Sequence, residues 1–364
     1  MSQAGWRGRL ESRLLALWYG PRWRALPLLP LSGVYALGRA LHGLPYRLGL
    51  RASVRLPVPV IVVGNITVGG TGKTPLVIHL AQILAEAGEA PGILCRGYGG
   101  RSGQWPQRVT AHSDPRVVGD EPVLIAQRTQ LPVAAGPNRA AAARLLLSQG
   151  CTVLLCDDGL QHHALARDVE IVVIDGARGL GNGIYLPAGP LREPVRRLAT
   201  ADAVVIQGEG FDIRRPVRRM SLPLGDTLDV ATARQRRPLA AFGGQTVHAI
   251  AGIGHPQRFF NALREAGLRV VEHAFPDHYD YRPQDLAFAA DAPLLMTEKD
   301  AVKCVGFAPA NAWFVPVSAR VPGSDIQGRR LSNFFAIPGR SAANKPVGSG
   351  RPAEYPVLRR AESG

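Results

Sequence analysis

The sequence has few cysteines, few acidic residues and no long apolar run. The four cysteines are Cys95, Cys151, Cys156 and Cys304. They form no CxxC pair and are too few for a disulfide scaffold, so we expect reduced thiols in a cytosolic compartment. The longest uncharged run near the N-terminus, residues 25–38, contains Pro27 and Pro30. It is shorter than the roughly 20 apolar residues that a bilayer core requires, and the spread of arginines does not fit a cleaved signal peptide.

Acidic residues are outnumbered, with 28 Asp and Glu against 43 Lys and Arg and a net charge of +15. Such an excess is typical of proteins that bind nucleic acid, but its distribution argues against that class. Residues 1–55 carry +8 and residues 338–364 carry +3, which leaves +4 for the 282 residues between them. We therefore expect no nucleic-acid partner. With 46% hydrophobic residues, the chain can bury a core, which excludes a wholly disordered basic protein.

The N-terminal segment combines arginine, tryptophan and leucine. Trp6, Trp18 and Trp23 lie among the arginines of the first 24 residues. Cations that meet anionic headgroups, and indoles that sit at the boundary, are typical of a segment that lies on a membrane. We predict that residues 1–55 form a basic, membrane-associated segment with a helix. The alternative is a basic amphipathic helix that packs on its own domain.

Short β-branched runs alternate with helical patterns in the middle of the chain. Strands are predicted over 57–64, 91–95, 153–156, 170–175 and 203–207, and helices over 73–88 and 138–149. This alternation predicts an α/β fold with a mainly parallel sheet. We expect a larger domain over 56–222, a connector over 223–246, a smaller C-terminal α/β domain over 247–337, and a disordered tail over 338–364.

A glycine-rich loop lies between the first predicted strand and helix. It reads Thr67-Val68-Gly69-Gly70-Thr71-Gly72-Lys73-Thr74. The P-loop pattern has glycine at the first position; Thr67 departs from it, but Gly69 and Gly70 keep the turn permissive. Backbone N–H groups here would point at phosphate oxygens, Lys73 would reach the β and γ phosphates, and the Thr74 hydroxyl would ligate Mg²⁺. The loop predicts a P-loop NTPase-like domain, the alternative being a glycine-rich turn with an incidental lysine.

Two acids end the apolar run before residue 157. A P-loop needs an acidic metal ligand at the end of a neighbouring strand, and Asp157, which directly ends the run, is the favoured ligand for Mg²⁺. Asp158 is a candidate for contact with metal, water or substrate. Strands also often end in Asp because of the turn that follows. His162, in the same turn, is a further substrate candidate, although a lone histidine is more often structural.

Eight blocks of this sequence together form a distinctive pattern. The blocks are VVGNITVGGTGKTP (62–75), RGYGG (96–100), VGDEP (118–122), CDDGLQHH (156–163), GNGIYLPAGPLREP (181–194), GIGHPQRFF (252–260), PDHYDY (276–281) and TEKDAVK (297–303). They resemble the tetraacyldisaccharide 4′-kinase family, the lipid A 4′-kinases. Eight blocks in order, between about residues 10 and 335, are far more specific than a GKT triplet alone. Thr67 matches the family's own version of the loop.

The resemblance implies a kinase that transfers the γ-phosphate of ATP, with Mg²⁺, to the 4′-hydroxyl of tetraacyldisaccharide 1-phosphate. The product would be lipid IVA in lipid A biosynthesis. The resemblance also implies two α/β/α domains with a cleft between them. The partners would be the acylated glucosamine disaccharide 1-phosphate and the anionic lipid at the cytoplasmic face of the bacterial inner membrane, where an N-terminal helix places the family. We expect a monomer.

The resemblance also implies the catalytic residues. The family's catalytic aspartate lies in the block matched by Asp120, and it works with the histidine matched by His278. Lys73 of the P-loop is the third catalytic candidate. A sugar hydroxyl is a poor nucleophile at neutral pH, so a positioned proton acceptor helps. Because the two residues fall in different predicted domains, their pairing would couple chemistry to closure. The alternatives are a helix N-terminal charge for Asp120 and a polar loop residue for His278.

Three further candidates complete the expected site. Glu121 is a candidate metal ligand beside Asp120. Tyr98, in the RGYGG loop, is a substrate candidate whose alternative role is packing. Arg192, in the LPAGPLRE loop, is a candidate for contact with a phosphate of the substrate, and its alternative is a surface salt bridge.

A competing function is a membrane-associated P-loop GTPase or ATPase that acts as a conformational switch. The TEKD block superficially resembles a guanine-reading NKxD motif, and basic N-terminal helices suit membrane switches. Thr297 stands where that motif has Asn, and the Lys and Asp are shifted. Lys299 and Asp300 either stabilise the second domain or touch the nucleotide, and the sequence does not separate these roles.

Overall fold

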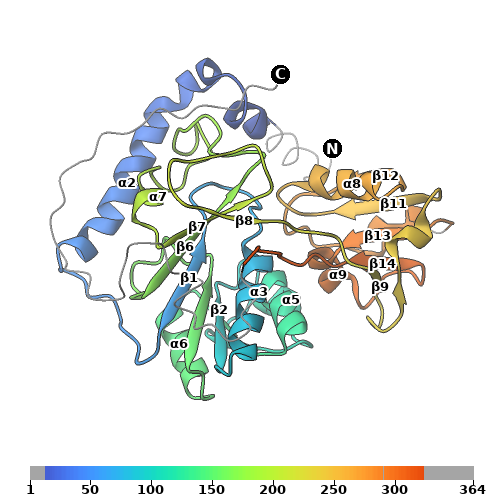
Figure 1. Cartoon of the computed structure of the whole chain (residues 1–364), viewed down its shortest axis with the longest axis horizontal. Helices are drawn as coiled ribbons and strands as arrows, with labels where there is room; N and C mark the ends of the chain where they lie inside the picture. The colour runs from blue at the N-terminus through green and yellow to red at the C-terminus, as the bar shows by residue number, and fades with distance from the viewer. Residues whose placement is uncertain (1–12, 290, 324–364) are drawn as a thin grey trace.

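The computed structural model describes residues 13–289 and 291–323, which form two α/β units side by side (Figure 1). The expected tail over 338–364, and the first twelve residues of the expected membrane segment, lie outside the described residues. Both units are built on largely parallel sheets, as the alternation of strands and helices predicts.

The first sheet has eight strands in the order β3-β4-β2-β5-β1-β6-β7-β8. They are β1 (Val60–Gly64), β2 (Pro91–Cys95), β3 (Gln107–Val109), β4 (Val133–Ala135), β5 (Val153–Asp157), β6 (Val169–Asp175), β7 (Ala203–Gln207) and β8 (Arg218–Met220). Only β3 pairs antiparallel within this sheet. All residues of β1, β2 and β5 are buried, as expected for parallel strands that helices cover on both faces.

Helices cover both faces of the first sheet. They are α3 (Lys73–Glu86), α4 (Pro115–Val118), α5 (Asp120–Thr129), α6 (Arg139–Leu147) and α7 (Arg197–Thr200). Apolar residues of α3 and α5 belong to one core cluster and those of α6 to the other. The Asn138 side chain caps α6 by accepting from the Ala141 N–H at 3.1 Å. The helices predicted over 73–88 and 138–149 are confirmed.

The second sheet has six strands in the order β10-β9-β14-β13-β11-β12. Its elements are β9 (Thr227–Asp229), β10 (Arg236–Arg237), η2 (Leu239–Phe242), β11 (Thr246–Ala251), α8 (Pro256–Glu265), β12 (Arg269–Ala274), η3 (Pro283–Ala289), β13 (Leu294–Thr297), α9 (Glu298–Cys304) and β14 (Ala312–Val315). The region 223–246, expected to be a connector, instead contributes β9, β10 and η2 to this unit. Thr227 and Phe242 are fully buried there. These two side chains help to pack the arginine-rich segment into the second unit.

Within the residues that the structure describes, the chain crosses between the two units twice, and the two crossings pair with each other. Ser221 and Arg320 form an antiparallel bridge with two backbone hydrogen bonds of 2.9 Å, and Leu224 pairs with Val317. After the second crossing, Val321 packs in the core of the first unit. The end of the predicted second domain therefore returns to the first, because its apolar residues complete that core.

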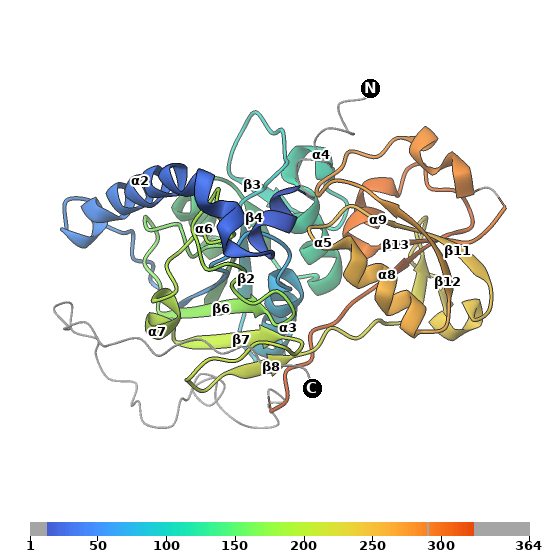
Figure 2. The same cartoon turned by 90° about the horizontal axis from the view of Figure 1, so that it is seen from above.

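The N-terminal elements are η1 (Arg22–Leu28) and α2 (Leu29–Arg47). Helix α2 lies along the first unit, on the side away from the second (Figures 1 and 2). Its inner side buries Ser32 and Gly43. Large apolar side chains are exposed along these elements: Trp23, Leu26, Leu29, Leu31, Val34, Leu37, Leu41 and Leu44. Among the described helices, none has the length and apolarity needed to cross a bilayer.

Candidate active site

The glycine-rich loop over 67–74 connects β1 to α3, as predicted. Gly69 and Gly72 have φ angles of +111° and +85°, which side-chain-bearing residues rarely adopt. A Cβ at Gly72 would also lie 3.0 Å from Met220 Cε. Gly72 is the N-cap of α3, so the loop ends at the positive end of the helix dipole. This is the geometry of a phosphate-binding loop.

Asp157 ends β5 beside this loop, and its carboxylate fits a magnesium ion. The Thr74 hydroxyl donates to Asp157 Oδ2 at 3.2 Å. Asp157 Oδ1 is buried and has no hydrogen-bond partner within the described part of the chain. Burial, followed by the charges of Glu121 and Asp158, raises the pKa of Asp157. A buried acceptor without a partner, among carboxylates that repel one another, suits a bound divalent cation.

Among residues 13–289 and 291–323, no three His, Cys, Asp or Glu side chains cluster closely enough to form a metal site by themselves. Thr74 and Asp157 would hold the ion together with water and phosphate oxygens, the arrangement that Mg²⁺ prefers in kinase sites. Glu121 lies near Asp157, and its carboxylate is already engaged by a lysine described below.

Asp158 and Arg192 form a second polar cluster next to Lys73. Arg192 Nη1 lies 3.1 Å from both oxygens of Asp158, and Lys73 Nζ lies 3.7 Å from Oδ1. Arg192 also donates to Asn65 Oδ1 at 3.1 Å and to Gln161 Oε1 at 2.5 Å. Burial raises the pKa of Asp158, but Lys73 and Arg192 outweigh it and lower the pKa. Arg192 lines the same cavity as the P-loop. Its salt bridge with Asp158 therefore lies in the cleft between the units and not on the outer surface.

Asp120 and His278 form a contact between the two units. His278 Nδ1 lies 3.0 Å from each carboxylate oxygen of Asp120. Burial raises the pKa of Asp120, but the hydrogen bond with His278 and the nearby lysines outweigh it and lower the pKa to about 2. Burial lowers the pKa of His278, but the bond with Asp120 outweighs it and raises the pKa. Each partner therefore favours the charged form of the other.

Two lysines of α9 lie beside this pair. Lys299 Nζ lies 3.1 Å from both Glu121 Oε1 and Asp277 Oδ1, and 3.3 Å from His278 Nε2. Lys303 Nζ lies 3.8 Å from Asp120 Oδ2. The sequence alone left the role of Lys299 open and missed that of Lys303. Their spacing of four residues in TEKDAVK, which places both on one face of a helix, was the available signal.

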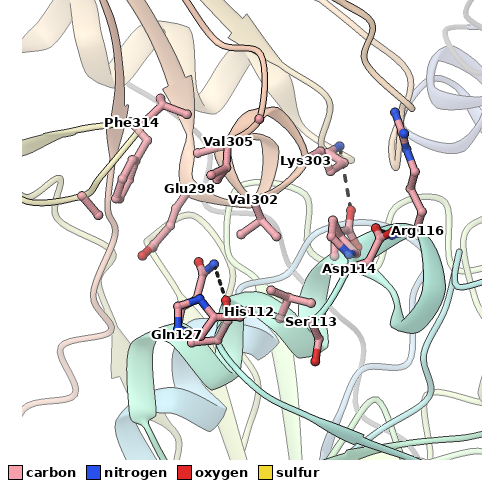
Figure 3. A pocket seen from close by; sticks show the side chains of 18 of the residues that line it. His112, Ser113, Asp114, Arg116, Gln127, Glu298, Val302, Lys303, Val305 and Phe314 are labelled. Atoms are coloured by element: carbon pink, nitrogen blue, oxygen red, sulfur yellow. Dashed lines mark hydrogen bonds and ion pairs between the residues drawn. The ribbon is translucent and has the colours of Figure 1, made fainter. Parts of the chain in front are cut away.

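Two cavities meet at the Asp120–His278 contact. One, of about 590 Å³, is lined by the P-loop, by Asp157, Asp158 and Arg192, and by His278. The other, of about 840 Å³, lies between α4–α5 and α9 (Figure 3). In that view Glu298 and Val302 of α9 lie across the space from Gln127 of α5. Tyr98 borders both cavities, and its ring centroid lies 4.8 Å from that of His278.

Not every expected residue reaches the cleft. His162 is absent from the residues that line the two cavities. A turn closed by the His162 N–H on the Gly159 carbonyl, at 3.0 Å, follows β5 there. The sequence analysis also missed Arg139, which is 2% exposed and donates to the Asp157 carbonyl at 3.2 Å. A buried arginine at the start of a helix has no distinctive local pattern.

Comparison with known proteins identifies the family of this chain. The model of the tetraacyldisaccharide-1-P 4′-kinase family matches residues 24–335. A tetraacyldisaccharide 4′-kinase from Alkalilimnicola ehrlichii is 53% identical over 85% of this chain and 93% of the relative, and one from Nitrosococcus oceani is 49% identical over 86% and 92%. A crystal structure of LpxK from Aquifex aeolicus in complex with ATP superposes with a TM-score of 0.70 and 31% identity, covering 83% of this chain and 96% of that one. The chain therefore belongs to the tetraacyldisaccharide 4′-kinase family.

Proposed function

We propose a role for each residue of the cleft in the reaction of this family. As a member, the chain transfers the γ-phosphate of ATP to the 4′-hydroxyl of tetraacyldisaccharide 1-phosphate in lipid A biosynthesis, with Mg²⁺. The lipid disaccharide substrate follows from the family. The competing function, a GTPase or ATPase switch, is not supported by these relatives. The roles of individual residues are our proposal.

The P-loop binds the nucleotide. In the loop over 67–74, the amides of residues 69–74 and the Lys73 ammonium hold the β and γ phosphates at the N-terminus of α3. The Val68 N–H already donates to the Pro190 carbonyl at 2.8 Å. Thr74 and Asp157 hold Mg²⁺, with Glu121 nearby; when bound, the ion neutralises charge on the phosphates. Arg192 and Asp158 lie beside Lys73, and we assign them to orienting the transferred phosphate and the acceptor.

Asp120 accepts the proton of the 4′-hydroxyl, and His278 orients its carboxylate. The contact between them, 3.0 Å long and made across the two units at the junction of the cavities, is the observation that carries this proposal. A carboxylate with a low pKa is a weak base towards a free alcohol. It suffices in phosphoryl transfer, because the hydroxyl becomes acidic as its bond to phosphorus forms. Tyr98, which lies against His278, is assigned to acceptor binding.

We place the enzyme on the anionic surface of the inner membrane, at its cytoplasmic face, as a monomer. Helix α2 supports this location, because Val34 and Leu37 on it are 68% and 60% exposed. Apolar side chains flanked by arginines suit a helix that lies in a lipid interface. This surface would bring the cleft to a substrate whose acyl chains keep it in the bilayer.

The test is a transfer assay with radiolabelled ATP and the disaccharide 1-phosphate in detergent. We expect His278→Gln to lower kcat by about 10²-fold with little change in ATP binding, since it removes the group that orients Asp120. His273→Gln, on strand β12, is the matched control and should turn over normally. Near-normal kcat in His278→Gln would refute the pairing, and a clear preference for GTP would contradict the assignment of ATP.

A further inference from the structure

We propose that Arg39, on helix α2, is a positioning residue for catalysis that acts through Glu193 on Arg192. The proposal rests on the proposed role of Arg192 in the cleft. It makes α2 part of the framework of the active site, in addition to any role at a membrane.

Residues 32–39 of helix α2 lie against the loop over 182–193 and are hydrogen-bonded to it. The Ser32 hydroxyl donates to the Tyr185 carbonyl at 2.8 Å and accepts from the Ala188 N–H at 3.1 Å. Just before η1, the Trp18 indole donates to the Pro187 carbonyl at 2.8 Å. The N-terminal segment therefore holds the middle of this loop by several specific hydrogen bonds.

The strongest contact lies at the end of the loop. Arg39 Nη1 lies 2.9 Å from Glu193 Oε2, and the two side chains are only 15% and 5% exposed. The Tyr35 hydroxyl, one turn earlier on α2, donates to the Arg192 carbonyl at 3.3 Å. Arg39 Nε and Glu193 Oε1 are buried and have no hydrogen-bond partner in the described ranges. Arg39 is thus the cation that compensates the buried Glu193 carboxylate.

Arg192 faces the opposite way, into the cleft. Its guanidinium bonds both oxygens of Asp158 at 3.1 Å, beside Lys73. The backbone N–H groups of Arg192 and Glu193 both donate to the Ile66 carbonyl, at 2.7 and 3.2 Å, directly before the P-loop. Arg192 and Glu193 are therefore held by α2 on one side and by Ile66, which precedes the P-loop, on the other. Because Glu193 follows Arg192 directly in the chain, we expect a shift of the Glu193 backbone to move Arg192 as well.

Removal of Arg39 would leave the Glu193 carboxylate buried without its cation, and the loop would move to hydrate it. We expect Arg39→Ala to lower kcat/KM for ATP about tenfold in detergent, because displacements of about 1 Å near reacting groups cost up to 10²-fold. Arg47→Ala is the matched control: it is an exposed arginine on the same helix and should leave kcat/KM unchanged. Arg39→Lys keeps the positive charge opposite Glu193 and controls for misfolding of the alanine variant. It should retain most of the activity.

A double-mutant cycle separates positioning from general destabilisation. If Arg39 acts through Arg192, Arg39→Ala should have little further effect in the Arg192→Ala background, whereas independent effects would multiply. Normal kcat/KM in Arg39→Ala, a loss in Arg39→Lys equal to that in Arg39→Ala, or multiplicative losses would each overturn the proposal. Normal activity in Arg192→Ala would instead show that the site assignment itself is wrong.

Discussion

Replacement of Asp120 by asparagine tests two properties of this residue in one variant: its role as proton acceptor and its contribution to stability. Asn keeps the shape of the carboxyl group but removes its charge, much as protonation would. The pKa of Asp120 falls from 3.8 to about 2 in the folded chain. That shift corresponds to a preference of about 2 kcal/mol for the ionised form in the native state. Because the side chain is only 5% exposed, solvent screening reduces this figure little.

We therefore expect Asp120→Asn to lower the free energy of unfolding by about 2 kcal/mol at pH 7, and to lower kcat by about 10²–10⁴-fold. Denaturant unfolding gives the first quantity, and the labelled-ATP assay gives the second. Asp212→Asn is the matched control, because the Asp212 side chain is 80% exposed. Wild-type stability in Asp120→Asn would refute the ion pair with His278, and wild-type turnover would refute the proton acceptor.

The same shift has a defined pH dependence. A carboxyl group whose native pKa is lowered stabilises the fold above its unfolded pKa and loses that contribution as the pH falls through the native value. The wild-type protein should therefore lose about 2 kcal/mol between about pH 4 and pH 2 through Asp120. Asp120→Asn should lack this part of the acid destabilisation. Parallel stability curves for the two proteins over this range would contradict the shift.

Three other variants test the P-loop, the sheet beneath it and the outer face of α2. Lys73→Ala should lower kcat/KM for ATP by about 10²–10³-fold in steady-state kinetics, since it removes a charge from the phosphates, and near-normal kinetics would contradict the assignment. Gly64→Ala should lower the free energy of unfolding by about 1–3 kcal/mol, because its Cβ would lie 2.6 Å from Leu160 Cγ in the core; Gly33→Ala, which has open space, should not. Leu37→Ser should weaken sedimentation with anionic lipid vesicles about tenfold, whereas Val305→Ser, 47% exposed on the second unit, should not; equal sedimentation of the two would refute the membrane surface.

The parts of the site that are local in the sequence were predictable. The loop over 67–74 and Asp157 each follow a short β-branched or aliphatic strand, and a pattern of fewer than ten residues fixes their chemistry. Neighbouring parallel strands then bring Thr74 and Asp157 together. The fold class was predictable for the same reason, because the central strands β1, β2 and β5 are buried on both faces and lack polar alternation.

The parts that depend on distant contacts were not predictable from the residues alone. Asp120 and His278 are 158 residues apart, and only the resemblance to a family connected them. The pair of Arg39 with Glu193 spans 154 residues, and an arginine among nine in a basic segment looks like any other. Strand β10 has two residues, both arginines, so its place in the sheet comes from its partner β9 rather than from its own propensity.

The paired crossings between the two units restrict how one can move against the other. A single flexible linker would leave the second unit free to rotate about every axis. Here residues 221–224 and 317–320 run antiparallel and are bonded to each other, so neither can lengthen or twist alone. Such a strap leaves mainly one degree of freedom, a bend across its width. We therefore expect any opening of the cleft to bend this strap, and its closure to bring His278 back opposite Asp120.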